Sequence, residues 1–195
     1  MQEYSHLTDE ELAEKAISDS DALYELFHRY EKKLKNYILK ISYLSVPCSE
    51  DILQETFIKI YKNLSAFETS LKFSSWIYRV THNETINYLR KNKKHLEIAS
   101  TENEEQIDYL NLFKNSLEIE EKFITREIKT KVREIIKNMP LKYREVIILK
   151  YIEDKSYDEI SDILQKPIGT ISALIYRAKK YFKQIAIKEN LHQLI

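Results

Sequence analysis

Turn-forming residues are scarce in this sequence. Its 195 residues include one glycine and three prolines, whereas folds built from β-hairpins need many tight turns, usually made with Gly, Pro, Asn or Asp. The sequence has no sustained alternation of apolar and polar residues, and Lys, Glu, Leu and Ile are abundant. This composition predicts an all-α fold.

Cysteine and long apolar runs are also lacking. The single cysteine, Cys48, excludes an internal disulfide and a four-cysteine zinc site. No apolar run approaches the roughly 18 residues that a membrane-spanning helix needs, and the N-terminal residues are polar and acidic, unlike a signal peptide. We therefore predict a cytoplasmic protein with no direct membrane insertion.

Catalytic groups do not converge in any recognisable motif. The five histidines show no metal-ligand spacing, and Cys48 has no partner motif of the kind found around nucleophilic cysteines. We therefore predict that the protein is not an enzyme. No catalytic residue, metal or cofactor is assigned.

Charge is unevenly distributed along the chain. The 31 basic and 31 acidic residues balance overall, but residues 97–121 contain one basic and eight acidic residues, and residues 122–195 contain 16 basic and nine acidic residues. An acidic segment with weak periodicity separates two periodic segments. We predict two helical domains, 1–96 and 125–195, joined by an acidic linker over 97–124.

The N-terminal domain contains three segments with helical periodicity. Thr8 followed by Glu11 fits a capping box at the start of the first segment, which continues past a possible break at residues 18–20. The stretch SEDILQETFIKIYKNLSAF repeats apolar residues at spacings of three and four, and a further helix is expected from about Ser74 to Lys93.

The only glycine lies in KPIGTISALIYRAKK, two positions after Pro167. Pro167 forbids continuation of the preceding helical segment, YDEISDILQ, because proline lacks a backbone N–H. We predict that Gly169 takes the unusual backbone angles of a tight corner and that Thr170 caps the next helix. This arrangement predicts a helix-turn-helix.

The second helix of this pair has two distinct faces. On a helical wheel, the residues expected to be buried are Ile171, Leu174, Ile175, Ala178 and Phe182. The opposite face is small at its start, then aromatic, then basic, which suits insertion into a DNA major groove. Such patterns also arise by chance, so a second feature is needed to assign DNA binding.

Two motif sets supply that feature. The segment MPLKYREVIILKYIEDKSYDEISDILQKPIGTISALIYRAKK resembles region 4 of bacterial RNA polymerase sigma factors of the extracytoplasmic-function (ECF) group of the sigma-70 family. The segments DILQETFIKIYKNLSAF and FSSWIYRVTHNETINYLRK resemble region 2 of the same group. Their order and spacing cover nearly the whole chain. The resemblance implies a sigma factor that binds core RNA polymerase and promoter DNA.

The resemblance also assigns roles within region 2. It implies that a polar helix face docks on the polymerase and that a neighbouring helix captures melted bases of the promoter −10 element, with Asn83 at the position that contacts a flipped base. The implied polymerase-binding residues are Asp51, Gln54, Glu55 and Lys59, and the implied −10 residues are Trp76, Tyr78, Arg79, Asn83, Arg90 and Lys91.

Region 4 is expected to recognise the −35 element as duplex DNA. Many relatives carry Arg or Lys at the position of Ser172 and another Arg at that of Leu174, so this chain is expected to make fewer charge-assisted base contacts. The implied −35 residues are Lys150, Thr170, Ser172, Ala173, Tyr176, Arg177 and Lys180.

The resemblance implies an inhibitory anti-sigma factor as a further partner. One alternative is an ordinary helix-turn-helix regulator with an unrelated N-terminal domain, which would lack the polymerase-docking and strand-capturing helices and would normally dimerise on a palindrome. Another is a scaffold built on a decayed sigma fold. The test that separates the sigma factor from the regulator is transcription with purified core polymerase.

Overall fold

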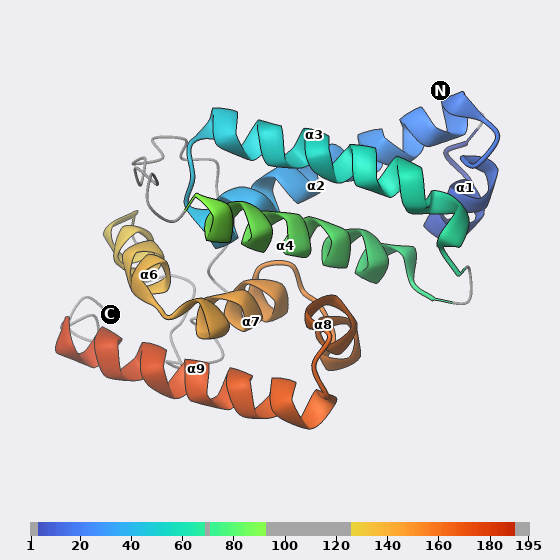
Figure 1. The fold of residues 1–195 in the computed structure, drawn as a ribbon. Coiled ribbons are helices and arrows are strands. Elements are labelled where there is room, and N and C mark those ends of the chain that lie inside the picture. The colour runs from blue at the N-terminus through green and yellow to red at the C-terminus, as the bar shows by residue number, and fades with distance from the viewer. Residues whose placement is uncertain (1–3, 69–70, 93–125, 190–195) are drawn as a thin grey trace. The chain divides into compact units, whose positions relative to one another are not determined.

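The computed structural model describes residues 4–68, 71–92 and 126–189. Every regular element in these residues is helical, which confirms the predicted all-α class. The helices form two compact units, one containing α1 to α4 and the other α6, α7, α9 and most of α8 (Figure 1). The predicted linker, 97–124, lies outside the described residues. Within the described helices, none is long and apolar enough to cross a bilayer.

The first unit is a bundle in which three long helices pack against one another. Helices α2, α3 and α4 make all three pairwise contacts, and the short α1 packs on α2 and α4. The elements are α1 (Asp9–Lys15), α2 (Ser20–Ser42), α3 (Val46–Asn63), the 3-10 turn η1 (Leu64–Ala66) and α4 (Phe73–Lys91).

Local capping sets the boundaries of the first helices. The Thr8 side chain accepts from the Glu11 N–H and the Glu11 carboxylate accepts from the Thr8 N–H, as the predicted capping box requires. The predicted break is also present, since α1 ends at Lys15 and the Asp19 carboxylate caps α2. Tyr43 ends α2 in the left-handed conformation, with φ 56°.

A polar cluster fastens the N-terminal segment to α2. Arg29 donates to Asp9 Oδ1 at 3.0 Å and to the carbonyl oxygens of Tyr4 and Leu7 at 2.7 and 2.9 Å. The Tyr30 hydroxyl donates to the second oxygen of Asp9 at 2.5 Å, and burial is the main reason that the pKa of Tyr30 is raised. These bonds orient α1 on the bundle, where Leu12 and Ala13 enter the core.

The second unit is built around the long helix α9, on which α6 and α7 pack. Its core contains Ile171, Ile175, Ala178 and Phe182, as predicted from the wheel, whereas Leu174 is only half-buried. The facing helices contribute buried Ile and Val residues of α6 and α7. The elements are α6 (Arg126–Asn138), α7 (Leu141–Tyr151), α8 (Tyr157–Leu164) and α9 (Ile168–Lys188).

The corner between α8 and α9 differs from the prediction in two respects. The left-handed residue is Gln165, the C-cap of α8 with φ 51°, and Gly169 does not have a positive φ. Helix α9 already begins at Ile168 with Pro167 at the N-cap, so Thr170 lies inside the first turn and is not the cap. Pro167 is tolerated at the N-cap because this residue lies outside the helix, with an extended ψ of 143°, and its missing N–H removes no intrahelical hydrogen bond.

Two bonds hold this corner in place. The Ser161 hydroxyl donates to the carbonyl oxygen of Lys166 at 2.6 Å. The Lys166 ammonium lies 3.3 Å from Oε1 of Glu145, a residue of α7 that is buried. Burial raises the pKa of Glu145, and the positive charge of Lys166 opposes that rise. The Lys166–Glu145 contact therefore joins the connection between α8 and α9 to α7.

Candidate nucleic-acid interface

An open pocket of about 330 Å³ lies in the first unit, where the end of α3 and the turn η1 face α4. This volume is at the lower end of the range for small-ligand pockets, about 300–1,000 Å³. Its lining is mixed, with an indole, two amides, an ion pair and small apolar groups. The lining residues are Lys59, Asn63, Ala66, Trp76, Val80, Asn83 and Glu84.

Trp76 forms an aromatic wall of the pocket. Its ring packs on Phe67 and Phe73, with centroids 5.4 and 5.6 Å apart and tilted planes, and the residue remains half-buried. Phe73 is fully buried and contacts Tyr30 of α2 edge-on. The core therefore supports the indole from behind while the pocket side stays accessible, which is the geometry on which an unstacked base can pack.

Asn83 lies on the same side of α4 as Trp76, seven residues or two turns further along, and is exposed. The predicted −10 residue Asn83 therefore lines the pocket together with the predicted aromatic Trp76. An amide beside an aromatic wall can hydrogen-bond the edge of a base that stacks on the ring.

Tyr78 is not available for such a contact, contrary to the prediction. It is 3% exposed and packs against Tyr37 of α2, with ring centroids 5.2 Å apart. Successive helix residues turn by about 100°, so Tyr78 lies on nearly the opposite side of α4 from Trp76. When Trp76 faces the pocket, Tyr78 must face the core.

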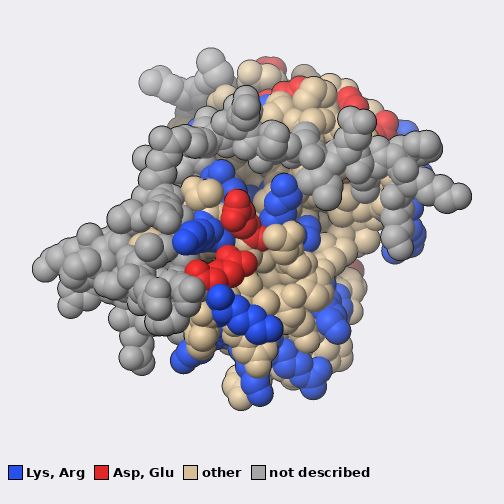
Figure 2. Space-filling model, turned by 90° about the vertical axis from the view of Figure 1, so that its left-hand side faces the viewer, with Lys and Arg blue, Asp and Glu red and all other residues tan. Residues whose placement is uncertain are grey.

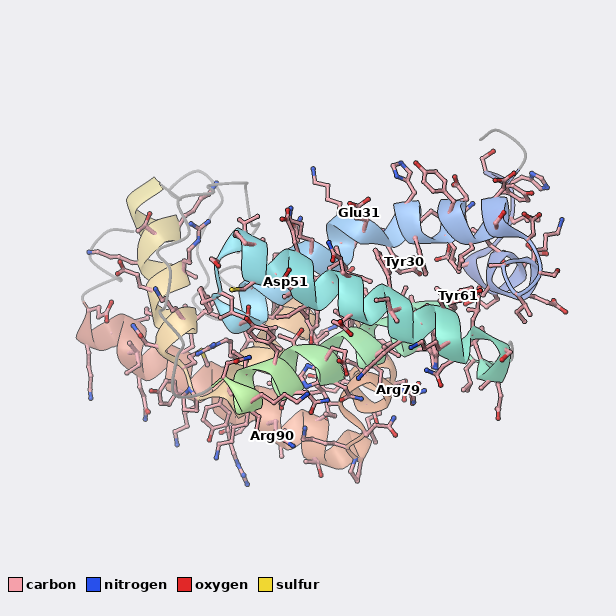
Figure 3. The ribbon with its side chains drawn as sticks, turned by 45° about the horizontal axis from the view of Figure 1, so that its top comes forward. Tyr30, Glu31, Asp51, Tyr61, Arg79 and Arg90 are labelled. Atoms are coloured by element: carbon pink, nitrogen blue, oxygen red, sulfur yellow. The ribbon has the colours of Figure 1, made fainter. Side chains whose placement is uncertain are left out.

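The remaining predicted −10 residues also belong to α4. Arg79 is half-buried, whereas Arg90 and Lys91 are exposed in its last turn. Arg79, Asn83 and Arg90 follow one another at spacings of four and seven, which places them along one side of the helix. Figure 3 shows Arg79 and Arg90 on α4. Cationic side chains along this line suit a phosphate backbone that leads into the pocket.

Lys59 faces α4 rather than the outer surface of α3. Its ammonium nitrogen lies 2.5 Å from Oε1 of Glu84, and both residues line the pocket. The sequence prediction grouped Lys59 with the polymerase-binding residues. On a helical wheel Lys59 is about 80° from Asp51, and that angle is enough to turn it to the neighbouring helix.

The outer surface of α3 carries the other three predicted polymerase-binding residues. Asp51, Gln54 and Glu55 are all exposed. The same surface continues into two apolar residues that the sequence analysis missed, Ile58 at 45% and Tyr61 at 62% exposed. Figure 3 shows Asp51 and Tyr61 at separate positions along α3. The missed signal was the wheel position of Ile58, which falls with the polar residues rather than with the apolar stripe.

In the second unit, the first half of α9 presents most of the predicted −35 residues. The exposed residues are Thr170, Ser172, Tyr176, Arg177 and Lys180, of which Tyr176 is 70% exposed. Ala173 is half-buried. Figure 2, which faces the C-terminal end of α9, shows Lys and Arg side chains in the lower part of the view, at the level of α9 in Figure 1. An exposed helix that begins with small residues and continues with cations fits a major groove.

Lys150 is more constrained than the sequence indicated. It lies half-buried in the last turn of α7, donates to the carbonyl oxygen of Lys155 at 3.3 Å, and its ammonium nitrogen lies 5.6 Å from the ring centre of Tyr157. These contacts orient its ammonium group near the start of α8.

Among the described residues, no cluster of His, Cys, Asp or Glu could hold a metal ion.

Family models of known proteins match segments in both units. Residues 26–95 match the family model for sigma-70 region 2, and residues 129–181 match that for sigma-70 region 4. Both describe parts of a transcription initiation factor rather than an enzyme.

Full-length relatives lead to the same family. The chain is 33% identical over 170 residues to the ECF RNA polymerase sigma factor SigW of Bacillus subtilis, covering 85% of this chain and 89% of that protein. It is 30% identical over 182 residues to the ECF RNA polymerase sigma-E factor of Escherichia coli K12, covering 89% and 92%.

Solved structures share the fold. CnrH, solved in complex with the cytosolic domain of CnrY, superimposes with a TM-score of 0.68 at 19% identity, covering 92% of this chain and 97% of that chain. The sigma factor RpoE of Bartonella quintana, solved with the anti-sigma factor NepR, gives 0.61 at 18% identity, covering 83% and 94%. The identity to curated relatives and the two family models show that this chain belongs to the extracytoplasmic-function group of sigma-70 family RNA polymerase sigma factors.

Proposed function

We propose that this chain binds core RNA polymerase in the cytoplasm and directs it to a specific set of promoters. The observation that carries the proposal is the pocket lined by Asn83 and Trp76 within the segment matched by region 2. An ordinary helix-turn-helix regulator has no use for a pocket of this kind beside an exposed amide.

In this proposal the pocket captures one unpaired base of the −10 element. The base stacks near Trp76 and its edge bonds to Asn83, while Arg79, Arg90 and Lys91 bind the phosphates of the same strand. A base held in the pocket is unavailable for pairing. Binding therefore shifts the promoter toward its open form without any chemical step by this chain.

The second unit recognises the −35 element through α9. Ser172 and Ala173 let the helix approach base edges, and Tyr176, Arg177 and Lys180 supply hydrogen bonds and cations. Ser172 stands where many relatives carry a base-contacting cation. The half-buried Leu174 stands where many carry a second. We propose that −35 recognition by this chain therefore depends less on charge-assisted base contacts.

The polymerase docks on the outer surface of α3. Asp51, Gln54 and Glu55 provide the polar contacts, and Ile58 and Tyr61 extend the same surface with exposed apolar area. Apolar side chains at the centre of a polar helix face are typical of helix-docking interfaces, where large aromatic groups contribute most of the binding free energy.

In this proposal the linker 97–124 connects the predicted domains, 1–96 and 125–195, while both are bound to the polymerase. We also propose that an anti-sigma factor holds the chain inactive. This idea draws support from the two structural neighbours, each solved with a bound partner. Such a partner need only cover one of the polymerase or promoter surfaces to prevent initiation.

Transcription with purified core polymerase tests the proposal. The native chain should direct initiation from promoters in its own genome. Asn83→Ala should retain core binding and lose promoter opening, whereas Asp51→Lys should lose core binding. Glu14→Gln, an exposed change on α1, serves as the control for loss of charge. A chain that binds duplex DNA but never associates with core polymerase would be an ordinary regulator instead.

A further inference from the structure

The pocket contains an acidic side chain that accepts from two neighbouring side chains. Glu84 lies next to Asn83 on α4, and its Oε1 accepts from the Lys59 ammonium at 2.5 Å and from the Asn87 amide at a long 3.5 Å. The Glu84 side chain is 15% exposed and that of Lys59 is 47% exposed. The carboxylate is thus the deeper member of the pair and the ammonium the outer one.

The two side chains together present a defined hydrogen-bonding pattern to the pocket. Lys59 and Asn87 both donate to Oε1 of Glu84, which leaves Oε2 to accept from a ligand. A carboxylate accepts and does not donate, whereas an ammonium donates through three N–H groups and does not accept. A ligand therefore meets an acceptor at depth and a donor nearer the mouth.

Nucleobases differ in how they match this pattern. The substituent furthest from the sugar, at the 4 position of pyrimidines or the 6 position of purines, is an amino donor in cytosine and adenine and a carbonyl acceptor in thymine and guanine. The adjacent ring nitrogen is an acceptor in the first pair and an N–H donor in the second. The far end of a base held by its sugar enters the pocket deepest.

We propose that Glu84 makes the pocket select an unpaired adenine or cytosine over thymine or guanine. The exocyclic amino group donates to Glu84 Oε2, and the ring nitrogen beside it accepts from Lys59. Thymine or guanine would place its carbonyl oxygen against the Glu84 carboxylate. Two hydrogen-bond acceptors would then face each other, and neither would have a donor. This inference rests on the proposed function and adds the chemistry of the captured base.

The test uses holoenzyme assembled from core polymerase and the full chain. Open complexes are selected from a DNA library randomised across both promoter elements, and the recovered non-template strands are sequenced. One −10 position should favour adenine and cytosine over thymine and guanine by at least about fivefold, the lower limit for a good base contact. With Glu84→Gln this preference should disappear, because the amide can both donate and accept.

A charge exchange separates base selection from a structural role of the ion pair. The double variant Lys59→Glu with Glu84→Lys keeps an ion pair across α3 and α4 but moves the donor to the deep position. It should reverse the preference, favouring thymine and guanine at the same position. Glu14→Gln removes an equal charge from the exposed side of α1 and should leave the preference unchanged.

The outcomes distinguish this inference from the proposed function. If native and Glu84→Gln holoenzymes open promoters with the same base ranking at every −10 position, or if the exchanged pair keeps the native ranking, selection by Glu84 is refuted while the sigma activity stands. If the native chain forms no open complex with core polymerase, the proposed function itself has failed.

Discussion

The carboxylate of Glu10 accepts a hydrogen bond from the backbone N–H of Phe73, with Oε1 2.8 Å from the nitrogen. Phe73 is the first residue of α4, and Lys72 at its N-cap provides no side-chain cap. A residue of α1, 63 positions away in sequence, therefore caps the helix that carries Trp76 and Asn83.

Glu10→Ala should destabilise the first unit by about 1 kcal/mol, the usual effect of losing a cap, to which loss of a negative charge at the helix N-terminus contributes. Fraying of the first turn of α4 should change the environment of Trp76, the only tryptophan in the chain. Urea titration followed by tryptophan fluorescence measures both effects. Glu14→Ala on the same helix is the control, and equal midpoints for the two variants would contradict the capping role.

The buried Glu145 should make the second unit less stable as pH rises. Burial raises the pKa of this carboxyl, so the folded state binds the proton more tightly than the unfolded state does. The stabilisation that this tighter proton binding gives the folded state is fully present below the unfolded pKa of about 4.3. It is lost as pH increases through the folded pKa. Glu145→Gln should remove this loss, so its stability relative to the native chain should grow from pH 4 upward in urea titrations.

Lys166→Ala should lower the stability of the second unit at neutral pH, whereas Glu145→Gln should raise it. Without the ammonium group, the Glu145 carboxylate keeps its burial and loses its counter-charge, which should cost about 1–3 kcal/mol at neutral pH. The loss should be smaller at pH 4, where the carboxyl is protonated. A pH-independent loss would indicate that Lys166 acts through packing alone.

Gly169→Ala should separate folding from DNA binding. A Cβ at this position meets nothing within 4 Å, and the residue is helical, so alanine should stabilise α9 by up to about 1 kcal/mol. The same methyl group would obstruct close approach of a DNA phosphate to the helix N-terminus, and −35 affinity should fall. Native affinity in this variant would show that DNA does not approach the first turn of α9.

Arg177→Ala should weaken −35 binding in one of two distinguishable ways. If the guanidinium binds phosphate, the slope of log affinity against log salt should decrease in magnitude by about 0.9. If it binds a base, the sequence preference should relax instead. Arg177→Lys keeps the charge and should preserve the salt slope. Unchanged affinity and slope in the alanine variant would exclude contact with DNA.

Much of the fold was predictable because it depends on short-range patterns. The capping box at Thr8, the break before Asp19 and the stripe from Ile171 to Phe182 each follow from residues within one or a few helical turns. Proline at position 167 correctly indicated where one helix stops and the next begins.

The corrected predictions have other causes. Glycine was assigned the strained corner because it tolerates a positive φ most easily, yet Gln165 takes that conformation as the C-cap of α8, where the N–H groups of Gln165 and Lys166 both bond to the Ser161 carbonyl oxygen. Tyr78 was assigned from its neighbours in sequence, and packing against α2 buries it. The direction in which a helix residue points depends on which helix lies against it.

The sequence by itself determined the helical class, the amphipathic faces and membership of the sigma-factor group, since periodicity and motif order are local properties of the chain. The tertiary structure decided which of those faces meet. Only packing of α3 against α4 brings Lys59 to Glu84 beside Asn83, and only α1 supplies the cap of α4. Contacts between residues distant in sequence are set by packing of whole helices, and no local pattern contains that information.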